Sequence, residues 1–269
     1  APALYDLTEL QRDANKKFGF SSKETLNILQ RLYENHKILT YPRTDSRYLS
    51  KDIVPTIKDR LEACGTGPYR KLAMTAKKKD LSGKLAFVND AKVSDHHAII
   101  PTEQFVDLSH MTNEERKIYD LVVRRFLAVL YPPFEYEQTQ VTVKVGGETF
   151  LASGKIVKAQ GWRAAYEEEV YSAEDEEEEE AYESGKSLKG QTLPELEKGQ
   201  EIKGLVLSLT EGKTKPPAHF NEATLLSAME NPTAYMESHD KAMAKTLGET
   251  GGLGTVATRA DIIEKLFKS

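Results

Sequence analysis

The spacing of apolar residues changes at Pro132 and Pro133, and this change limits the folds that the chain can adopt. Before the two prolines, apolar residues recur at the spacing of a helix, at Ile118, Leu121, Val122, Phe126 and Leu130. After them, β-forming and polar residues alternate in 139–154, where Gly146 and Gly147 are typical of a hairpin turn. The segment 198–212 predicts another strand. The sequence therefore indicates an α+β protein, with a sheet-rich part at roughly 135–209.

Two helices are expected at the start of the chain, in residues 8–35, with a break at 18–20. Ser21 and Glu24 have the spacing of a capping box, which predicts the start of the second helix. That helix carries an apolar stripe, which we expect to face the core, formed by Leu26, Leu29, Leu32 and Tyr33.

Further helices are expected at 51–64, 221–236 and 257–269, the last two separated by the glycine-rich segment 248–255. A basic segment follows the first of these helices, and we expect it to be an exposed cationic surface. It contains Lys71, Lys77, Lys78, Lys79 and Lys84.

The two halves of the chain carry opposite charge, although the net charge of the whole is −5. Residues 1–130 contain 22 Lys and Arg against 17 Asp and Glu, whereas residues 131–269 contain 15 against 25. Much of the acid lies in 167–180, which we interpret as a solvated loop. The first half is therefore suited to binding a polyanion.

The sequence gives no sign of a membrane segment or of an oxidising compartment. No apolar run approaches the ~20 residues of a spanning helix, and the initial APALYDLTEL lacks the regions of a signal peptide. The single cysteine, Cys64, allows neither an internal disulfide nor a cysteine-based zinc site. We therefore expect a cytoplasmic protein.

Tyr41 and Arg43 form the first candidate for chemistry. Pro42 biases the backbone before it to an extended form, so the side chains of Tyr41 and Arg43 are expected to emerge on one face. The guanidinium can stabilise a phenolate and grip a phosphate at two points, which favours attack of the phenol on phosphate. The alternative is an ordinary turn, in which Tyr41 packs and Arg43 pairs with Asp45.

His96 and His97 form the second candidate. A histidine near its usual pKa of ~6.5 can donate a hydrogen bond to phosphate or carry a positive charge when a polyanion binds. The alternative for such a pair is packing, and the neighbouring sequence supplies no further metal ligands.

These two segments resemble type IA DNA topoisomerases, and most closely the bacterial topoisomerase III branch. ILTYPRTDSRYL at 38–49 is similar to the active-site signature, and SDHHAIIPT at 94–102 is similar to the HHAIIPT segment. The resemblance implies that Tyr41 is the nucleophile that joins the 5′ phosphate, that Arg43 positions the scissile phosphate, and that His96 lies near the cleavage site. It also implies roles in the turn and in contact with DNA for Thr44, Asp45, Ser46 and His97.

Two later segments resemble the family's PPxRYTEATL and GIGTPATRA motifs, namely KPPAHFNEATLLSAME at 215–230 and GGLGTVATRADIIEKL at 251–266. In the family they line a groove for single-stranded DNA, and a glycine-rich turn before a helix presents free N–H groups to phosphate. The residues implied to bind DNA are Glu222, Thr224, Thr255, Thr258 and Arg259. The segments depart from the motifs at His219, Phe220, Leu253 and Val256.

The resemblance implies three parts: a helical, winged-helix-like domain with the active-site tyrosine at 1–130, part of an antiparallel β arch at 131–209, and a partial helical DNA-binding domain at 210–269. The family's magnesium ligands belong to an N-terminal Toprim domain that includes an Asp-x-Asp pair. No strand-embedded Asp-x-Asp occurs here. We therefore expect an excised central fragment that holds no metal itself, with magnesium used only by the complete enzyme.

The implied activity is ATP-independent breakage, strand passage and rejoining of single-stranded DNA through a 5′ phosphotyrosine, an isomerase reaction. The complete enzyme is expected to be a monomer at the bacterial nucleoid, whereas the fragment is expected to be inactive and to associate through exposed seams. One alternative is a non-catalytic single-stranded-DNA-binding module. The other, a tyrosine recombinase, places its tyrosine near the C-terminus after a His-x-x-Arg, unlike Tyr41.

Overall fold

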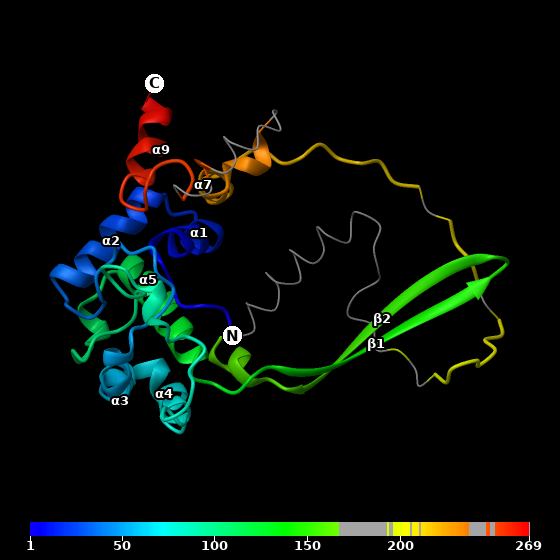
Figure 1. Cartoon of the computed structure of the whole chain (residues 1–269), viewed down its shortest axis with the longest axis horizontal. Coiled ribbons are helices and arrows are strands. Elements are labelled where there is room, and N and C mark those ends of the chain that lie inside the picture. Colours follow the sequence, from blue (N-terminus) through cyan, green and yellow to red (C-terminus); the bar gives the residue numbers. More distant parts are fainter. Residues whose placement is uncertain are drawn as a thin grey trace. The chain divides into compact units, whose positions relative to one another are not determined.

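The first helices begin at the capping residues that the sequence predicts. The computed structural model describes residues 1–166, 193, 196–204, 206–209, 211–236, 246–247 and 251–268. Its first two helices, α1 (Leu7–Phe18) and α2 (Ser22–Glu34), are separated by a short turn (Figure 1). Ser21 accepts a bond from the Glu24 amide and Glu24 accepts one from the Ser21 amide, which confirms the predicted capping box.

The helix expected at 51–64 forms in two parts. Lys51–Thr56 is a 3₁₀ helix that contains Pro55, and the α-helix α3 spans only Ile57–Cys64. In an α-helix that began at Lys51, Pro55 would be the fifth residue, where it has no N–H to donate to the carbonyl of Lys51 and its ring crowds that carbonyl. The prediction of one continuous helix was therefore wrong.

The main core forms around α5 (Asn113–Ala128), and α4 (Arg70–Ala76) packs beside it. α5 starts at a capping box and buries most of its length, which explains its apolar spacing. Its side chains meet those of α1 and α2 in fully buried positions, which include Leu7, Leu10, Leu29, Leu32, Ile118 and Phe126. Cys64 is also fully buried, and this burial raises the pKa of its thiol to about 12, so it is a packing residue at neutral pH.

Two later helices form, α7 (Glu222–Glu230) and α9 (Arg259–Lys268). The helix predicted at 257–269 is confirmed, whereas the one predicted at 221–236 ends at Glu230, before Pro232, and a 3₁₀ turn follows it. The two helices share a small apolar cluster of Leu226, Met229 and Ile263, on which Leu225 also packs. α7 lies against α1, and α9 lies against α2. The remaining short 3₁₀ turns are at Gly67–Tyr69, Asp90–Lys92, Leu108–His110, Gly161–Ala165 and Pro232–Tyr235.

The predicted hairpin forms from β1 (Glu135–Val145) and β2 (Glu148–Ala159), paired antiparallel with Val145 opposite Glu148. Gly146 and Gly147 form the turn with φ values of 58° and 90°. Positive φ at both central residues is the geometry of a type I′ turn, which matches the twist of the strands.

The strand expected at 198–212 does not form in the described residues of that segment. The described sheet has β1 and β2 alone, and the side chains of Val206 and Leu209 are 91% and 95% exposed. Alternating apolar residues stabilise a strand only when a neighbouring strand supplies hydrogen bonds and a face to pack on. No described strand lies beside this segment, and that part of the prediction was wrong.

The chain divides into two compact units. The first contains Ala1–Pro132, Trp162–Ala165 and Phe220–Ser269, and the second contains Pro133–Gly161 and Tyr166–His219. The coarse prediction of helices with a small antiparallel sheet is confirmed, whereas the acidic stretch 167–180 lies outside the described residues. Within the described ranges, we find no helix with the length and apolarity to cross a bilayer.

Candidate active site

The backbone around Tyr41 is held against the chain that follows His96. The amide of Thr40 donates to the carbonyl of Ile100 at 3.0 Å, and the amide of Ile100 donates to the hydroxyl of Thr40 at 3.0 Å. This reciprocal pair fixes the residue before the tyrosine to the histidine segment. Tyr41 and His96, 55 positions apart in the sequence, are thereby neighbours.

The ring of Tyr41 lies between two other rings. The centroid of the His96 imidazole is 4.2 Å away with the planes inclined by 36°, and the centroid of the Tyr33 ring is 5.5 Å away, nearly edge-on at 82°. His96 is exposed and Tyr41 is half-buried. The aromatic contacts therefore restrict the phenol while one side of the site stays open to solvent.

Tyr33 was expected in the core, and the structure corrects this. Its side chain is 37% exposed and packs against Tyr41, whereas Leu29 and Leu32 of the same helix are fully buried. The buried stripe of α2 ends at Leu32, so Tyr33 lies at the edge of the core. The spacing alone could not distinguish this edge position from the core.

Arg43 also reaches α2. Its Nη2 donates to Oε1 of Gln30 at 3.4 Å. Gln30 and Tyr33 are three positions apart on one helix and so share a face, which places the guanidinium of Arg43 and the ring of Tyr41 along the same side of α2. The described residues show no ion pair between Arg43 and Asp45, which is exposed, so the pairing expected for an ordinary turn is not formed.

Thr44 and Ser46 are buried and hold the tyrosine segment in place. Thr44 is 2% exposed, and its hydroxyl donates to the carbonyl of His96 at 2.9 Å. Ser46 is 4% exposed, and its hydroxyl donates to the carbonyl of Lys92 at 2.8 Å. The two hydroxyls tie the segment that carries Tyr41 to the segment that ends at His96.

His97 turns towards the protein instead of the open side. Its Nδ1 is 2.8 Å from the carbonyl oxygen of Ala98. Burial lowers the pKa of His97, and the positive charge of Arg60 adds to this, although the bond to Ala98 works in the opposite direction. His97 is therefore predominantly neutral at pH 7.

The downstream candidates on α7 have different surroundings. Oε2 of Glu222 accepts bonds from the amide and the hydroxyl of Ser22, at 2.7 and 2.8 Å, and so caps the N-terminus of α2. Thr224 is exposed and forms a capping box with Asn221 at the start of α7. One side chain fixes α7 to α2, while the other lies on the surface.

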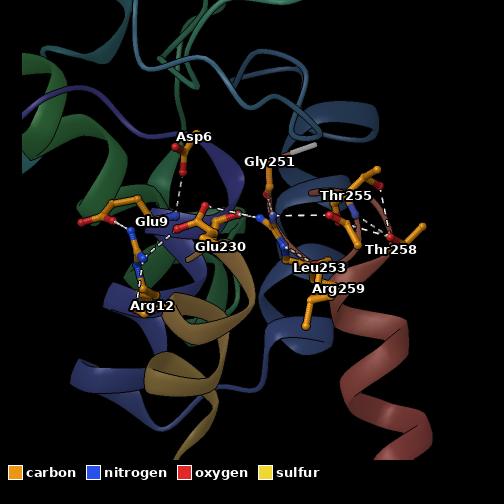
Figure 2. A network of polar contacts seen from close by, with 12 residues as sticks. Asp6, Glu9, Arg12, Glu230, Gly251, Leu253, Thr255, Thr258 and Arg259 are labelled. Carbon is orange, nitrogen blue, oxygen red and sulfur yellow. Dashed lines mark hydrogen bonds and ion pairs between the residues drawn. The ribbon is translucent and has the colours of Figure 1, made fainter. Parts of the chain in front are cut away.

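Arg259 on α9 closes the glycine-rich turn from inside. The whole residue is 4% exposed. Its guanidinium donates to the carbonyls of Gly251 at 2.7 Å and Leu253 at 3.1 Å (Figure 2). Thr255 and Thr258 are exposed and bond to each other through the Thr255 amide and the Thr258 hydroxyl at 2.9 Å. The structure thus places the two threonines on the surface and the arginine in the interior.

A network of ion pairs links these parts, and of its members the sequence identified only Arg259 as a candidate. Glu9 bonds Arg12 within α1, Arg12 reaches Oε2 of Glu230 at 2.8 Å, and Arg259 reaches Oε1 of Glu230 at 3.3 Å (Figure 2). Arg47, six residues after Tyr41, pairs with Glu9 at 2.8 Å. The spacing of Glu9 and Arg12 allows a contact within α1, but Glu230 lies 218 positions from Arg12, so local spacing could not predict that pair.

The described residues do not fit a magnesium ion. They contain no cluster of three or more His, Cys, Asp or Glu side chains that could hold a metal. The described residues therefore supply no ligand set for the magnesium that the resemblance implies.

The whole chain is similar to known proteins. Residues 1–269 match the model of a family described as DNA topoisomerase. The chain is 61% identical over 269 residues to DNA topoisomerase 3 of Bacillus subtilis strain 168, and equally to that of Bacillus licheniformis. The alignments cover 100% of this chain and 36% of each relative, so the chain spans about a third of their length.

Among solved structures, full-length topoisomerase I of Thermotoga maritima matches the fold with a TM-score of 0.62 at 22% sequence identity. The match covers 99% of this chain and 38% of that protein. The similarity in fold agrees with the family match and with the relatives at 61% identity, and it confirms the resemblance described above. The chain belongs to the DNA topoisomerase family.

Proposed function

We propose that this chain carries the nucleophile of a type IA DNA topoisomerase that acts on single-stranded DNA. Oη of Tyr41 attacks a phosphodiester: the bond from Oη to phosphorus forms, the bond to the 3′ oxygen breaks, and the phenolic proton ends on that oxygen. The product is a 5′ phosphotyrosine with a free 3′ hydroxyl. Attack by this hydroxyl reverses the step after a second strand has passed, so no nucleotide cofactor is consumed.

The observation that carries this proposal is the contact of Tyr41 with His96 beside Arg43. The centroid of the exposed His96 imidazole lies 4.2 Å from that of the Tyr41 ring. The guanidinium of Arg43 contacts Gln30, on the face of α2 that Tyr41 also contacts. In the proposal Arg43 grips the scissile phosphate and His96 donates a hydrogen bond to a phosphoryl oxygen as charge develops there. Both groups act on the phosphate that Tyr41 attacks.

The remaining candidates divide into two roles in this proposal. Exposed side chains contact the strand directly, and these are Asp45, Thr224, Thr255 and Thr258. Buried or internally bonded side chains hold the contact surfaces in shape, and these are Thr44, Ser46, His97, Glu222 and Arg259. Residues 1–130 act as the winged-helix-like domain, 131–209 as part of the arch, and 210–269 as part of the helical DNA-binding domain.

The proposal extends to the complete protein. It acts as a monomer at the bacterial nucleoid, and magnesium is bound by residues other than those described here. The isolated chain binds single-stranded DNA weakly, associates through exposed apolar residues such as Leu151 and Leu209, and relaxes no supercoils. Robust relaxation of a supercoiled plasmid by the purified chain would contradict this part of the proposal.

The central test uses a chimera in which this chain replaces the segment that it matches in Bacillus subtilis DNA topoisomerase 3. The chimera is expected to relax a negatively supercoiled plasmid and to leave a DNA adduct on Tyr41, identified by mass spectrometry after denaturation. Tyr41→Phe is expected to abolish both while single-stranded DNA binding changes by less than about twofold, because only the nucleophilic oxygen is lost.

The same experiment separates the binding-module alternative. A non-catalytic module predicts equal plasmid topology and no adduct in both the unchanged chimera and its Tyr41→Phe variant. Circular dichroism of the two proteins shows whether each is folded, and an adduct on another tyrosine would overturn the assignment of Tyr41.

A further inference from the structure

We propose that the exposed face of α3 and α4 is a second DNA-contact surface, which binds the phosphate backbone of the strand that Tyr41 attacks. We call it the α3–α4 basic surface. It consists of exposed lysines on α3, on α4 and in the turns that follow, namely Lys58, Lys71, Lys77, Lys78, Lys79 and Lys84. The inference rests on the proposed function, because that function supplies single-stranded DNA as the partner.

These lysines stand on a backbone that is fixed to the core. Ala73 and Ala76 of α4 are 2% and 1% exposed, so the inner side of this helix is packed. The hydroxyl of Tyr69 donates to Asp120 of α5 at 3.0 Å, and the hydroxyl of Tyr131 donates to the carbonyl of Leu72 at 3.1 Å. The positive charges are therefore presented at defined positions, which distinguishes the surface from a flexible basic tail.

Most of the positive charge on this face is not neutralised. Lys77 pairs with Glu62 at 3.2 Å, and the carboxylate of Asp80 accepts hydrogen bonds from the amide and hydroxyl of Ser82 at 2.9 and 2.7 Å. Among the described residues no acid forms an ion pair with the other lysines of the surface. In a chain whose net charge is −5, an excess of cations on one face indicates a polyanionic partner more than a need for solubility.

The α3–α4 basic surface adjoins the elements that carry the tyrosine. Arg60 of α3 points inward, donates to the carbonyl of Pro101 at 2.8 Å and pairs with Glu103 at 2.8 Å. Pro101 in turn pairs with Leu39, two residues before Tyr41. The inner side of α3 thus contacts Pro101, which pairs with the segment that carries Tyr41. Lys58 lies on the outer side of α3, so a DNA strand bound at Tyr41 can continue onto the lysines.

The test measures binding of the chain to a fluorescein-labelled single-stranded oligonucleotide by anisotropy over a range of KCl concentrations. Each phosphate contact contributes roughly 0.7 to the slope of log K against log salt for single strands. The triple variant K77Q/K78Q/K79Q is expected to lower that slope by about 2 and to weaken binding about tenfold at low salt. K77R/K78R/K79R, which keeps the charge, is expected to bind as the unchanged chain does.

A control with the same change in net charge is K144Q/K198Q/K203Q, which removes three exposed lysines of the second unit. Its binding is expected to change by less than about twofold. An unchanged slope in K77Q/K78Q/K79Q, or an equal loss in the control, would overturn the inference. Circular dichroism of each variant verifies that the surface substitutions leave the fold intact.

Arg43→Gln in the same assay keeps the two proposals apart. Weaker binding in Arg43→Gln with an unchanged K77Q/K78Q/K79Q supports the site at Tyr41 and rejects the α3–α4 basic surface. The opposite result supports the surface and counts against a phosphate contact of Arg43.

Discussion

The imidazole of His96 and the phenol of Tyr41 are in ring contact, with centroids 4.2 Å apart, although neither residue lies in a regular strand or helix. The contact depends on Thr44, whose hydroxyl bonds to the carbonyl of His96 at 2.9 Å. A buried hydroxyl three residues after the tyrosine thus determines where the histidine lies. Together with the bonds between Thr40 and Ile100, it ties the two segments together on both sides of Tyr41.

We expect Tyr33 to position Tyr41 for attack. Replacing Tyr33 with Leu removes an aromatic contact worth about 1 kcal/mol, which permits other orientations of the Tyr41 ring. In the chimera, the rate of adduct formation at saturating DNA is expected to fall about three- to tenfold, with unchanged affinity. Tyr33→Phe keeps the ring and is expected to restore the rate. Equal rates in the Leu and Phe variants would contradict this role.

We expect Gly252 to tolerate no side chain. Its φ is 90°, and a Cβ would lie 2.1 Å from the carbonyl oxygen of Met229. Gly252→Ala must therefore displace the turn and break the bond from the amide of Leu253 to Met229, now 2.7 Å. Hydrogen exchange at the Leu253 amide is expected to accelerate at least tenfold.

Gly251 offers the matched control for this change. Its φ is also positive, at 74°, but a Cβ there meets nothing within 4 Å. Gly251→Ala is expected to cost only about 1 kcal/mol of backbone strain and to leave the exchange of Leu253 nearly unchanged. Similar exchange rates in both variants would show that backbone strain at positive φ, and not the close approach to the Met229 carbonyl, causes the change.

We expect Arg259 to hold α9 and the glycine-rich turn together. Arg259→Met removes a buried guanidinium and leaves the carbonyls of Gly251 and Leu253 without a donor, which is expected to cost on the order of 3 kcal/mol. Hydrogen exchange of the α9 amides is the measurement. Lys268→Met, on the same helix but with a side chain 74% exposed, is expected to change it little. Equal exchange in the two variants would refute the role.

The free energy of unfolding is expected to decrease as the pH is lowered, in two separate pH ranges. The pKa of His97 is lowered from 6.5, mainly by burial, so the unfolded chain takes up the proton first. The stability contributed by neutral His97 is present above pH 6.5 and is lost as the pH falls through the lowered folded-state pKa. Burial alone would raise the pKa of Glu9, but Arg12 and Arg47 lower it below 4.5, which places its window below pH 4.5.

Urea unfolding between pH 7.5 and 3 measures this dependence. His97→Asn is expected to flatten the upper window only, and Glu9→Gln the lower window only, because each substitution removes one titrating group. An undiminished slope between pH 6.5 and 5 in His97→Asn would refute the first assignment.

The sequence predicted the elements whose cause is local. Ser21 and Glu24 cap α2 over three residues, and Gly146 and Gly147 determine the hairpin turn, so both were predictable without tertiary structure. The motifs also identified Tyr41 and His96 as candidates, but their contact depends on hydrogen bonds between segments 55 positions apart. Periodicity carries no information about such pairing.

The errors have a common physical origin. Tyr33 shares the spacing of a core residue, yet the core ends before it and Tyr41 becomes its neighbour. The segment 198–212 has the alternation of a strand, yet the described residues give it no strand to pair with. In each case the neighbours in space decide the outcome.

The ion pairs of Arg12 and Arg259 with Glu230 join parts of one unit whose backbone connection runs through residues 133–219. We therefore expect side-chain contacts, and not the backbone connection alone, to hold α7 and α9 against α1. Cleavage within 211–219 should leave a nicked complex whose two fragments stay associated at low salt, because Arg12 and Arg259 still pair with Glu230. The fragments should separate at high salt and reassociate when the salt is removed.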